Sequence, residues 1–380
     1  MSNTYCPLPW VHSSLQNGNT ILPCCAFMDS GEFMDQGKFE DLFFSKKMNQ
    51  IRQGMLDGKK IKGCEQCYFQ EQSGMESMRQ RAIRKFGHVT EINVRDLNIV
   101  FDNICNLKCR MCSSGYSHLW FDEEKELYGT TFSPTKYFQN TFYREIDLSS
   151  VEHYDITGGE PLYSPHFNPF LKKINQETDV KNISIDFFTN GTIKPDNETI
   201  DILKKFKSVF ITISIDAIGP LNNFIRKNSD FDDIKQNLDF YHTLTDNFSI
   251  NILTTVGIYN AIFVEEIKNY FKEYYPKFAW NYDLIQYPEH LSIRNMPTEL
   301  KNIYKKYIID KSILSYMNDN ADDLFGHFLN FHNDLNKIRN ETLVGNDILQ
   351  KFIETKIYNV SKSETEMYYK NLIKDLTGNG

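Results

Sequence analysis

The sequence predicts an α/β fold: an incomplete barrel of parallel strands, preceded by a small metal-stapled module and followed by helices. Three observations support this prediction. Short β-branched or aromatic runs alternate with helical patterns between about residues 95 and 290. All eight cysteines lie before residue 113. From residue 297 onward the pattern is helical. We therefore expect an N-terminal module over 1–90, a barrel over 91–295 and a helical region over 296–380.

The barrel is predicted from six strand-like runs, each followed by a helical pattern. Among the helices, Phe231–Leu244 follows Ser229 and Asp230, two residue types that cap helix N-termini. Six such units with right-handed crossovers would curl into a TIM-like partial (β/α)6 barrel with an open side. The candidate strands are Leu97–Phe101, His153–Ile156, Ile183–Phe188, Val209–Ile215, Ser249–Val256 and Trp280–Ile285.

Composition narrows the classes of function. The chain has 42 Lys and Arg against 50 Asp and Glu, so a net charge of -8 gives no overall attraction to nucleic acid or anionic membrane. No apolar run approaches the ~20 residues of a membrane span, and no signal peptide is recognisable, which predicts a cytoplasmic protein. In a reducing compartment, clustered cysteines indicate metal binding rather than disulfides.

The segment Cys105-Asn-Leu-Lys-Cys109-Arg-Met-Cys112 directly follows the first predicted strand. Parallel α/β folds build their active sites at the carboxyl ends of strands. Three thiolates at this spacing can bind three irons of a [4Fe–4S] cluster and leave the fourth iron open to a small chelating molecule. A zinc site or inert buried cysteines are the alternatives.

The CxxxCxxC spacing resembles the signature of the radical S-adenosylmethionine (SAM) superfamily. The segment Thr157-Gly158-Gly159-Glu160-Pro161, after the second predicted strand, is similar to the GGEP motif of that superfamily. Its glycines would let the backbone approach a ligand closely, and Glu160 would accept a hydrogen bond from the ammonium of methionine. The resemblance implies an enzyme that takes an electron from reduced flavodoxin or ferredoxin and cleaves SAM to a 5′-deoxyadenosyl radical.

Further matches to this superfamily appear in the expected order. Thr189 and Asn190 end the third predicted strand, Ser214 ends the fourth, and Arg226 follows soon after. The resemblance assigns Thr189 and Asn190 to the ribose of SAM, and Ser214 with Arg226 to its carboxylate. Met111 would lie near adenine, although an aromatic residue is usual there. For the strand-end residues, a turn or capping role stays open.

Four N-terminal cysteines form a second candidate metal site. Cys6, Cys24 and the pair Cys64 and Cys67 resemble the twitch or SPASM-type auxiliary-cluster segment of radical SAM proteins, which in better-known members follows the barrel. The resemblance implies one auxiliary iron–sulfur cluster, of the [4Fe–4S] type, with Cys25 as the spare cysteine. Four cysteines are equally the ligand set of structural zinc, so that metal remains the alternative.

The leading hypothesis is a maturase that abstracts hydrogen from a ribosomally made (RiPP-type) peptide, because relatives with auxiliary clusters often modify peptides. The alternatives are a radical SAM enzyme acting on a small sugar, nucleotide or metabolite, and a non-catalytic zinc-stapled binding protein. Two other residues have simpler expectations. His290, in the loop after the sixth strand, is either solvated or a proton carrier, and Arg339 is read as a surface charge.

Overall fold

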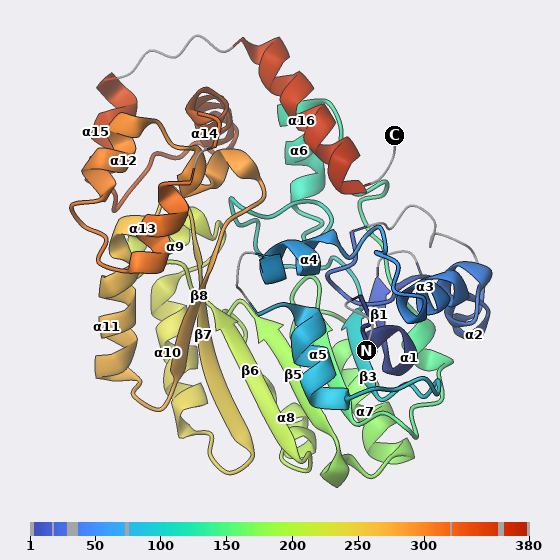
Figure 1. Cartoon of the computed structure of the whole chain (residues 1–380). Helices are drawn as coiled ribbons and strands as arrows, with labels where there is room; N and C mark the ends of the chain where they lie inside the picture. The colour runs from blue at the N-terminus through green and yellow to red at the C-terminus, as the bar shows by residue number, and fades with distance from the viewer. Residues whose placement is uncertain are drawn as a thin grey trace.

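The computed structural model describes residues 4–16, 19–28, 37–72, 76–319, 321–355 and 361–377. At its centre is an eight-stranded sheet in the order β2-β1-β3-β4-β5-β6-β7-β8 (Figure 1). Every neighbouring pair is parallel except β1 and β2, which is consistent with a partial barrel. The strands are β1 (His12–Gln16), β2 (Thr20–Leu22), β3 (Asp96–Val100), β4 (His153–Thr157), β5 (Ser184–Thr189), β6 (Ser208–Ser214), β7 (Phe248–Val256) and β8 (Ala279–Leu284).

The six predicted strands are confirmed, each to within one residue at both ends, as β3 to β8. The sheet is nevertheless larger than predicted, because β1 and β2 of the N-terminal zone extend it beyond β3. Polar side chains of β1 form hydrogen bonds with polar side chains of β3. His12 Nδ1 lies 2.8 Å from Asp96 Oδ1, and Ser14 Oγ donates to Asn98 Oδ1 at 2.6 Å. The N-terminal zone is therefore joined to the sheet by strand pairing as well as by packing.

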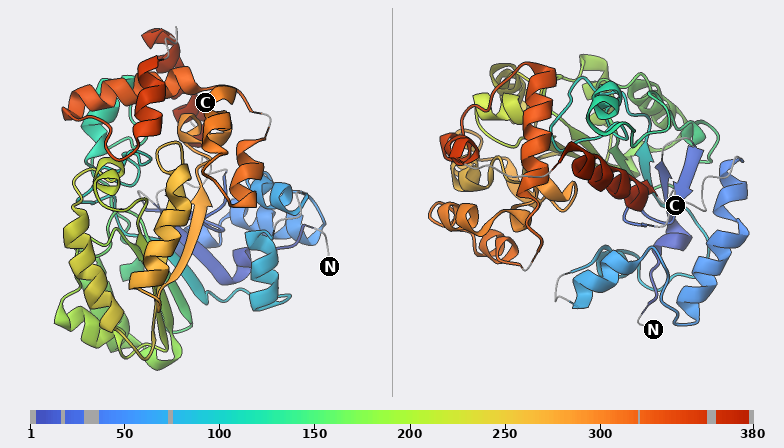
Figure 2. Two further views of the ribbon diagram at one scale, coloured as in Figure 1. Left: turned by 90° about the vertical axis from the view of Figure 1, so that its left-hand side faces the viewer. Right: turned by 90° about the horizontal axis from the view of Figure 1, so that it is seen from above.

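The two faces of the sheet differ in character. On one face buried apolar side chains such as Ile99, Ile185 and Ile211 form the main hydrophobic core. On the other face alternate residues are polar, for example Asp155 and Asp186. Figure 2 shows the barrel helices and the N-terminal helices on opposite sides of the sheet. Those on the apolar side are α7 (Phe167–Glu177), α8 (Asn197–Leu203), α10 (Phe231–Thr243) and α11 (Val264–Tyr274).

The remaining helices belong to the two ends of the chain and to the loops after the strands. Helices α14 and α16 pack against α6, which directly follows the candidate cluster loop. Among the described residues, no helix is long and apolar enough to cross a lipid bilayer. The helices are α1 (Leu8–Val11), α2 (Phe39–Phe43), α3 (Lys46–Leu56), α4 (Glu65–Gln72), α5 (Met78–Phe86), α6 (Trp120–Tyr128), α9 (Pro220–Ile225), α12 (Thr298–Tyr304), α13 (Lys311–Met317), α14 (Phe325–Arg339), α15 (Asp347–Thr355) and α16 (Lys362–Thr377).

Candidate active site

The three cysteines of the CxxxCxxC segment lie together at the carboxyl end of β3. Cys105 is buried, and Cys109 and Cys112 are partly buried. Burial, with the neighbouring Cys109 thiol, raises the pKa of Cys112 to about 12. Burial also raises the pKa of Cys105, and Cys109 and Cys112 add to that effect. The three sulfurs are thus within electrostatic reach of one another, and without a bound metal their thiols are neutral at pH 7.

Two nitrogen donors point at these sulfurs. The side-chain amide of Asn190 donates to Cys105 Sγ at 3.9 Å, and Arg226 Nη1 donates to Cys109 Sγ at 3.8 Å. Arg226 is buried, and its Nε lies 2.8 Å from the carboxylate of Asp216 at the end of β6. Three clustered thiols with amide and guanidinium donors suit an anionic iron–thiolate cluster. The residues present therefore fit the group that the motif implies.

Asn190 and Arg226 were both predicted to contact SAM. The sequence assigned Asn190 to ribose and Arg226 to the carboxylate, whereas both side chains here contact cysteine sulfurs. The partner of Arg226, Asp216, was not singled out as a site residue. Its position in the sequence, two residues beyond the strand end at Ser214, could have identified it as a candidate. The contacts of these residues with SAM remain predictions.

Glu160, from the loop after β4, is 1% exposed. Its carboxylate accepts hydrogen bonds from the backbone of Asn190 at 2.6 Å, the hydroxyl of Thr189 at 2.9 Å and the backbone of Leu162 at 3.1 Å. Burial raises the pKa of Glu160 to about 7, although these donors act in the opposite direction. Its charge also raises the pKa of Cys105, so the carboxylate lies close to the cluster loop.

The two glycines before Glu160 allow the loop after β4 to pack against the cluster loop. Gly158 has a φ of +114°, and a Cβ there would come within 2.9 Å of the Asp102 carbonyl. A Cβ on Gly159 would overlap the carbonyl of Ile104. The backbones are instead joined by hydrogen bonds, from Gly159 to Asp102 at 3.1 Å and from Glu160 to Ile104 at 2.9 Å. The close approach that the glycines permit is to protein backbone.

Two other predicted SAM contacts lie beside this group. Ser214 is the last residue of β6 and is partly exposed. Met111 lies in the cluster loop, also partly exposed, and packs against the second hydrophobic core of the protein, to which Trp120 belongs. Met111 thus lies within the cluster loop itself, and Ser214 lies at the carboxyl end of another strand of the same sheet.

The N-terminal cysteines form a second group. Cys6, Cys24, Cys64 and Cys67 line one cavity. Burial raises the pKa values of Cys6 and Cys64 to about 12. Among the described residues, no three His, Cys, Asp or Glu side chains meet closely enough to hold a single metal ion. A [4Fe–4S] cluster, whose thiolates bind four separate irons, does not require such convergence.

Cys25 differs from its neighbour Cys24. It is exposed, and its sulfur lies 4.0 Å from Met78 Sδ. Cys24 lines the cavity shared by the other N-terminal cysteines, whereas Cys25 does not line it.

Two expectations about single residues are wrong. His290 is 2% exposed, and its Nε2 lies 3.1 Å from the hydroxyl of Tyr369, so it is neither solvated nor free to carry protons at the barrel mouth. Burial lowers its pKa to about 3. Arg339, which was expected at the surface, is 9% exposed and forms an ion pair with Glu123 at 2.7 Å.

Comparison with known proteins places part of the chain in a family. Residues 99–265 match the model of the radical SAM superfamily. No curated protein matches the sequence. The segment that matches holds all three cysteines of the cluster loop together with Glu160, Asn190 and Arg226.

Several solved structures are similar to the chain at low identity. A histidine-tagged form of anSMEcpe with bound AdoMet is 21% identical, with 56% of this chain and 57% of that chain covered and a TM-score of 0.38. Streptococcus suis SuiB bound to precursor peptide SuiA is 14% identical, with coverage of 81% and 67% and a TM-score of 0.38. TYW1 with a lysine-pyruvate adduct is 14% identical, with coverage of 56% and 74% and a TM-score of 0.31. The chain spans little more than half the length of the anSMEcpe structure. Residues 99–265, which hold the candidate site, thus match the radical SAM superfamily of enzymes.

Proposed function

We propose that this enzyme binds a [4Fe–4S] cluster through Cys105, Cys109 and Cys112 and abstracts hydrogen from a peptide. The observation that carries the proposal is the grouping of these three thiols at the end of β3 with Glu160 from the next strand end. When bound, the cluster and SAM together supply reductive cleavage to methionine and a 5′-deoxyadenosyl radical. The match of residues 99–265 to an enzyme superfamily favours this proposal over the non-catalytic binding protein.

The residues of this chain would bind the cluster and orient SAM. Cys105, Cys109 and Cys112 would hold the cluster as thiolates, and three cysteines would leave one iron available to SAM. Glu160 is already fixed by Thr189 and Asn190, so its carboxylate can attract the ammonium of methionine without reorganising. Following the resemblance, Thr189 and Asn190 border the ribose, Ser214 and Arg226 the carboxylate, and Met111 the adenine.

The four N-terminal cysteines would hold one auxiliary cluster. Support comes from the shared cavity lined by Cys6, Cys24, Cys64 and Cys67. Because the N-terminal helices cover the polar face of the sheet, a cluster there would lie on the side opposite the barrel helices. It would fix this module in place and could relay electrons. Reduced flavodoxin or ferredoxin is the proposed electron donor.

An extended peptide suits the open sheet. Within the described part of the chain, β8 pairs with β7 alone, which leaves its outer edge with unpaired backbone groups. Three residues of β8 are exposed, namely Ala279, Asn281 and Asp283. Such an edge can add one more strand from a bound peptide. This feature favours a peptide over a small sugar, nucleotide or metabolite.

Anaerobic turnover tests the proposal. The protein is reconstituted with iron and sulfide, reduced with dithionite in the presence of SAM, and the release of 5′-deoxyadenosine is measured by chromatography. We expect release from the wild type and from Cys25→Ala, but not from Cys109→Ala. A wild-type protein that carries a cluster and yields no 5′-deoxyadenosine contradicts the proposal.

The substrate class is tested by co-expression with any short peptide encoded beside the gene, followed by mass spectrometry of that peptide. A mass change that requires the intact cluster loop supports the peptide assignment. An unchanged peptide, combined with deuterium transfer to 5′-deoxyadenosine from a labelled sugar or nucleotide, refutes it.

A further inference from the structure

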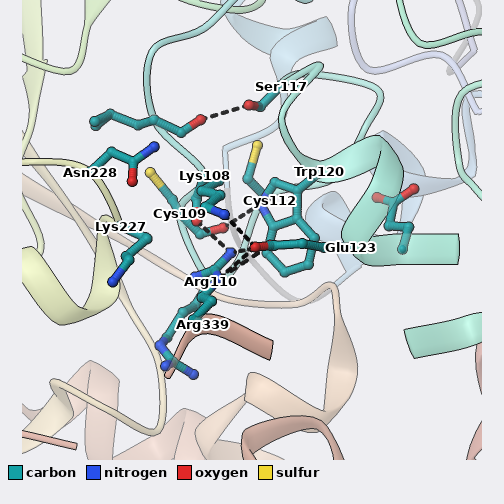
Figure 3. A network of polar contacts seen from close by, with 12 residues as sticks. Lys108, Cys109, Arg110, Cys112, Ser117, Trp120, Glu123, Lys227, Asn228 and Arg339 are labelled. Atoms are coloured by element: carbon teal, nitrogen blue, oxygen red, sulfur yellow. Dashed lines mark hydrogen bonds and ion pairs between the residues drawn. The ribbon is translucent and has the colours of Figure 1, made fainter. Parts of the chain in front are cut away.

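The backbone of the cluster loop is held by side chains from three separate parts of the chain. Residues 103–119 form turns rather than a helix or strand, so their carbonyl groups need other partners. Four consecutive carbonyls in this loop each accept a hydrogen bond from a different side chain. Figure 3 shows Ser117, Trp120 and Arg339 around this loop. Asn106 accepts from Asn228 at 3.4 Å, Leu107 from Ser117 at 2.6 Å, Lys108 from Arg339 at 2.9 Å and Cys109 from Trp120 at 2.8 Å.

Arg339, the last residue of α14, is itself fixed by a buried acid. Its Nη2 lies 2.7 Å from Glu123 of α6, and Glu123 also accepts from Lys108 Nζ at 2.5 Å. The exposed fraction of the side chain is 0% for Arg339 and 8% for Glu123. The guanidinium group lies over the ring of Trp120, 4.8 Å from its centroid. A planar guanidinium can hold a carboxylate and a carbonyl at the same time, which an ammonium group cannot do with the same geometry.

A second set of contacts ties the loop to the segment that follows α14. Arg110, between the second and third cysteines, pairs with Glu341. Glu341 also accepts from Lys227 Nζ at 2.7 Å, and the backbone of Lys227 accepts from Lys108 at 3.1 Å. The C-terminal helical region therefore contacts both spacer segments of the CxxxCxxC motif.

We propose that Arg339, Glu123 and Trp120 are positioning residues that hold the cluster loop in its ligand geometry before any cluster binds. A turn-rich loop with unpaired carbonyls would sample many conformations, and ordering it would reduce the affinity for the cluster. Here the ordering is provided by α6 and α14. The inference rests on the proposed function, since it assigns the C-terminal helices a role in cluster retention.

The test uses the full chain carrying Arg339→Met or Trp120→Phe, the second of which removes the indole donor and keeps one aromatic ring. The rate at which a chelator bleaches the visible absorbance of the reconstituted cluster is measured. Because each variant removes one hydrogen bond to the loop, we expect roughly tenfold faster loss in each. We also expect an altered electron paramagnetic resonance (EPR) spectrum of the reduced cluster. Arg339→Lys, which keeps the charge, should restore part of the retention.

Arg95→Met is the matched control, because Arg95 forms a surface ion pair with Glu152 at 3.0 Å. It should lose its cluster at the wild-type rate. If Arg339→Met and Trp120→Phe are folded by circular dichroism and match the wild type in both cluster loss and EPR spectrum, the proposal is wrong. If Arg339→Met does not fold, Trp120→Phe decides alone.

Hydrogen exchange separates this inference from the proposed function. In the cluster-free wild type the backbone amides of Lys108, Arg110 and Cys112, which donate to backbone carbonyls, should be protected. In the two variants they should exchange about tenfold faster, because the loop is less well held. Suppose that the wild type binds no cluster, but its loop amides are protected and exchange faster in the two variants. This result contradicts the proposed function and leaves the positioning role intact. Unprotected amides in the cluster-free wild type overturn the positioning role.

Discussion

The side-chain amide of Asn190 donates a hydrogen bond to the sulfur of Cys105, 3.9 Å away. The same amide donates to Asn106 Oδ1 at 2.8 Å, and its backbone donates to Glu160 at 2.6 Å. One residue at the end of β5 thus connects the first cysteine of the cluster loop to the acid of the next strand end. An N–H group aimed at a cluster sulfur stabilises the more negative, reduced state.

Replacing Asn190 with Leu should make the reduction potential of the cluster more negative, because the reduced state loses this donor. The potential is measured by redox titration followed by EPR. Asn237→Leu is the control, since the Asn237 amide donates to the carbonyl of Gly191 in the same turn. A potential that stays constant in Asn190→Leu, or becomes more positive, contradicts this account.

Glu160→Gln should weaken SAM binding roughly tenfold, because a charge-assisted contact with the ammonium of methionine is lost. The dissociation constant is measured by equilibrium dialysis with labelled SAM on the reconstituted protein. Thr189→Val is the comparison variant, since it removes a hydroxyl that orients Glu160 but leaves the carboxylate in place. Its effect should be smaller. Equal affinity of the Gln variant and the wild type would remove Glu160 from the SAM site.

The neighbouring cysteines Cys24 and Cys25 provide a matched pair for the auxiliary cluster. The reconstituted wild type should contain roughly eight irons per chain, four for each cluster, and Cys24→Ala should contain about half as many. Cys25→Ala should retain all of them, because Cys25 is not among the residues that line the cavity shared by the other four N-terminal cysteines. Iron and sulfide analysis gives both numbers. Zinc in place of iron after anaerobic purification would identify a structural zinc site instead.

Stability should fall as the pH rises from about 6.5 to about 9.5. Burial opposes protonation of His153, but its hydrogen bonds with Asp186 and Asp96 raise its pKa to about 9. A raised histidine pKa stabilises the fold fully below the ordinary value near 6.5, and the stabilisation is lost as the pH passes through the raised value. The charged or titratable groups around His153 and its partner carboxylates are Asp96, Asp155, Asp186, His12 and Lys85.

Over this range we expect a loss of about 1–2 kcal/mol in the free energy of unfolding, measured by urea denaturation. His153→Gln cannot ionise and should lack this part of the pH dependence. An identical fall in the variant and the wild type would show that His153 is not its source.

The barrel strands could be predicted because their apolar side chains alternate or run continuously, as in Val209–Ile215. Strand β1 could not be predicted from such a pattern. Its residues His12 and Ser14 are buried by pairing with Asp96 and Asn98, which lie 84 residues away in the sequence. The hydrogen bonds that stabilise β1 are therefore invisible in any local window.

Some site residues could likewise be predicted from the sequence and others could not. Cys105, Cys109 and Cys112 are recognisable because their spacing is itself the ligand geometry. Arg339 is not, because it contacts the Lys108 carbonyl across 231 residues and lies in the last turn of a helix, where a basic residue is common. Contacts that depend on how distant segments pack leave no signature in composition or spacing.

Electron–nuclear double resonance of the reduced, reconstituted enzyme with isotopically labelled SAM tests the central claim most directly. If one iron is left open by the three cysteines of the loop after β3, label in the amino and carboxylate groups of SAM should couple to the cluster spin. Cys25→Ala should show the same coupling. A well-formed cluster that shows no coupling to either group would contradict the account.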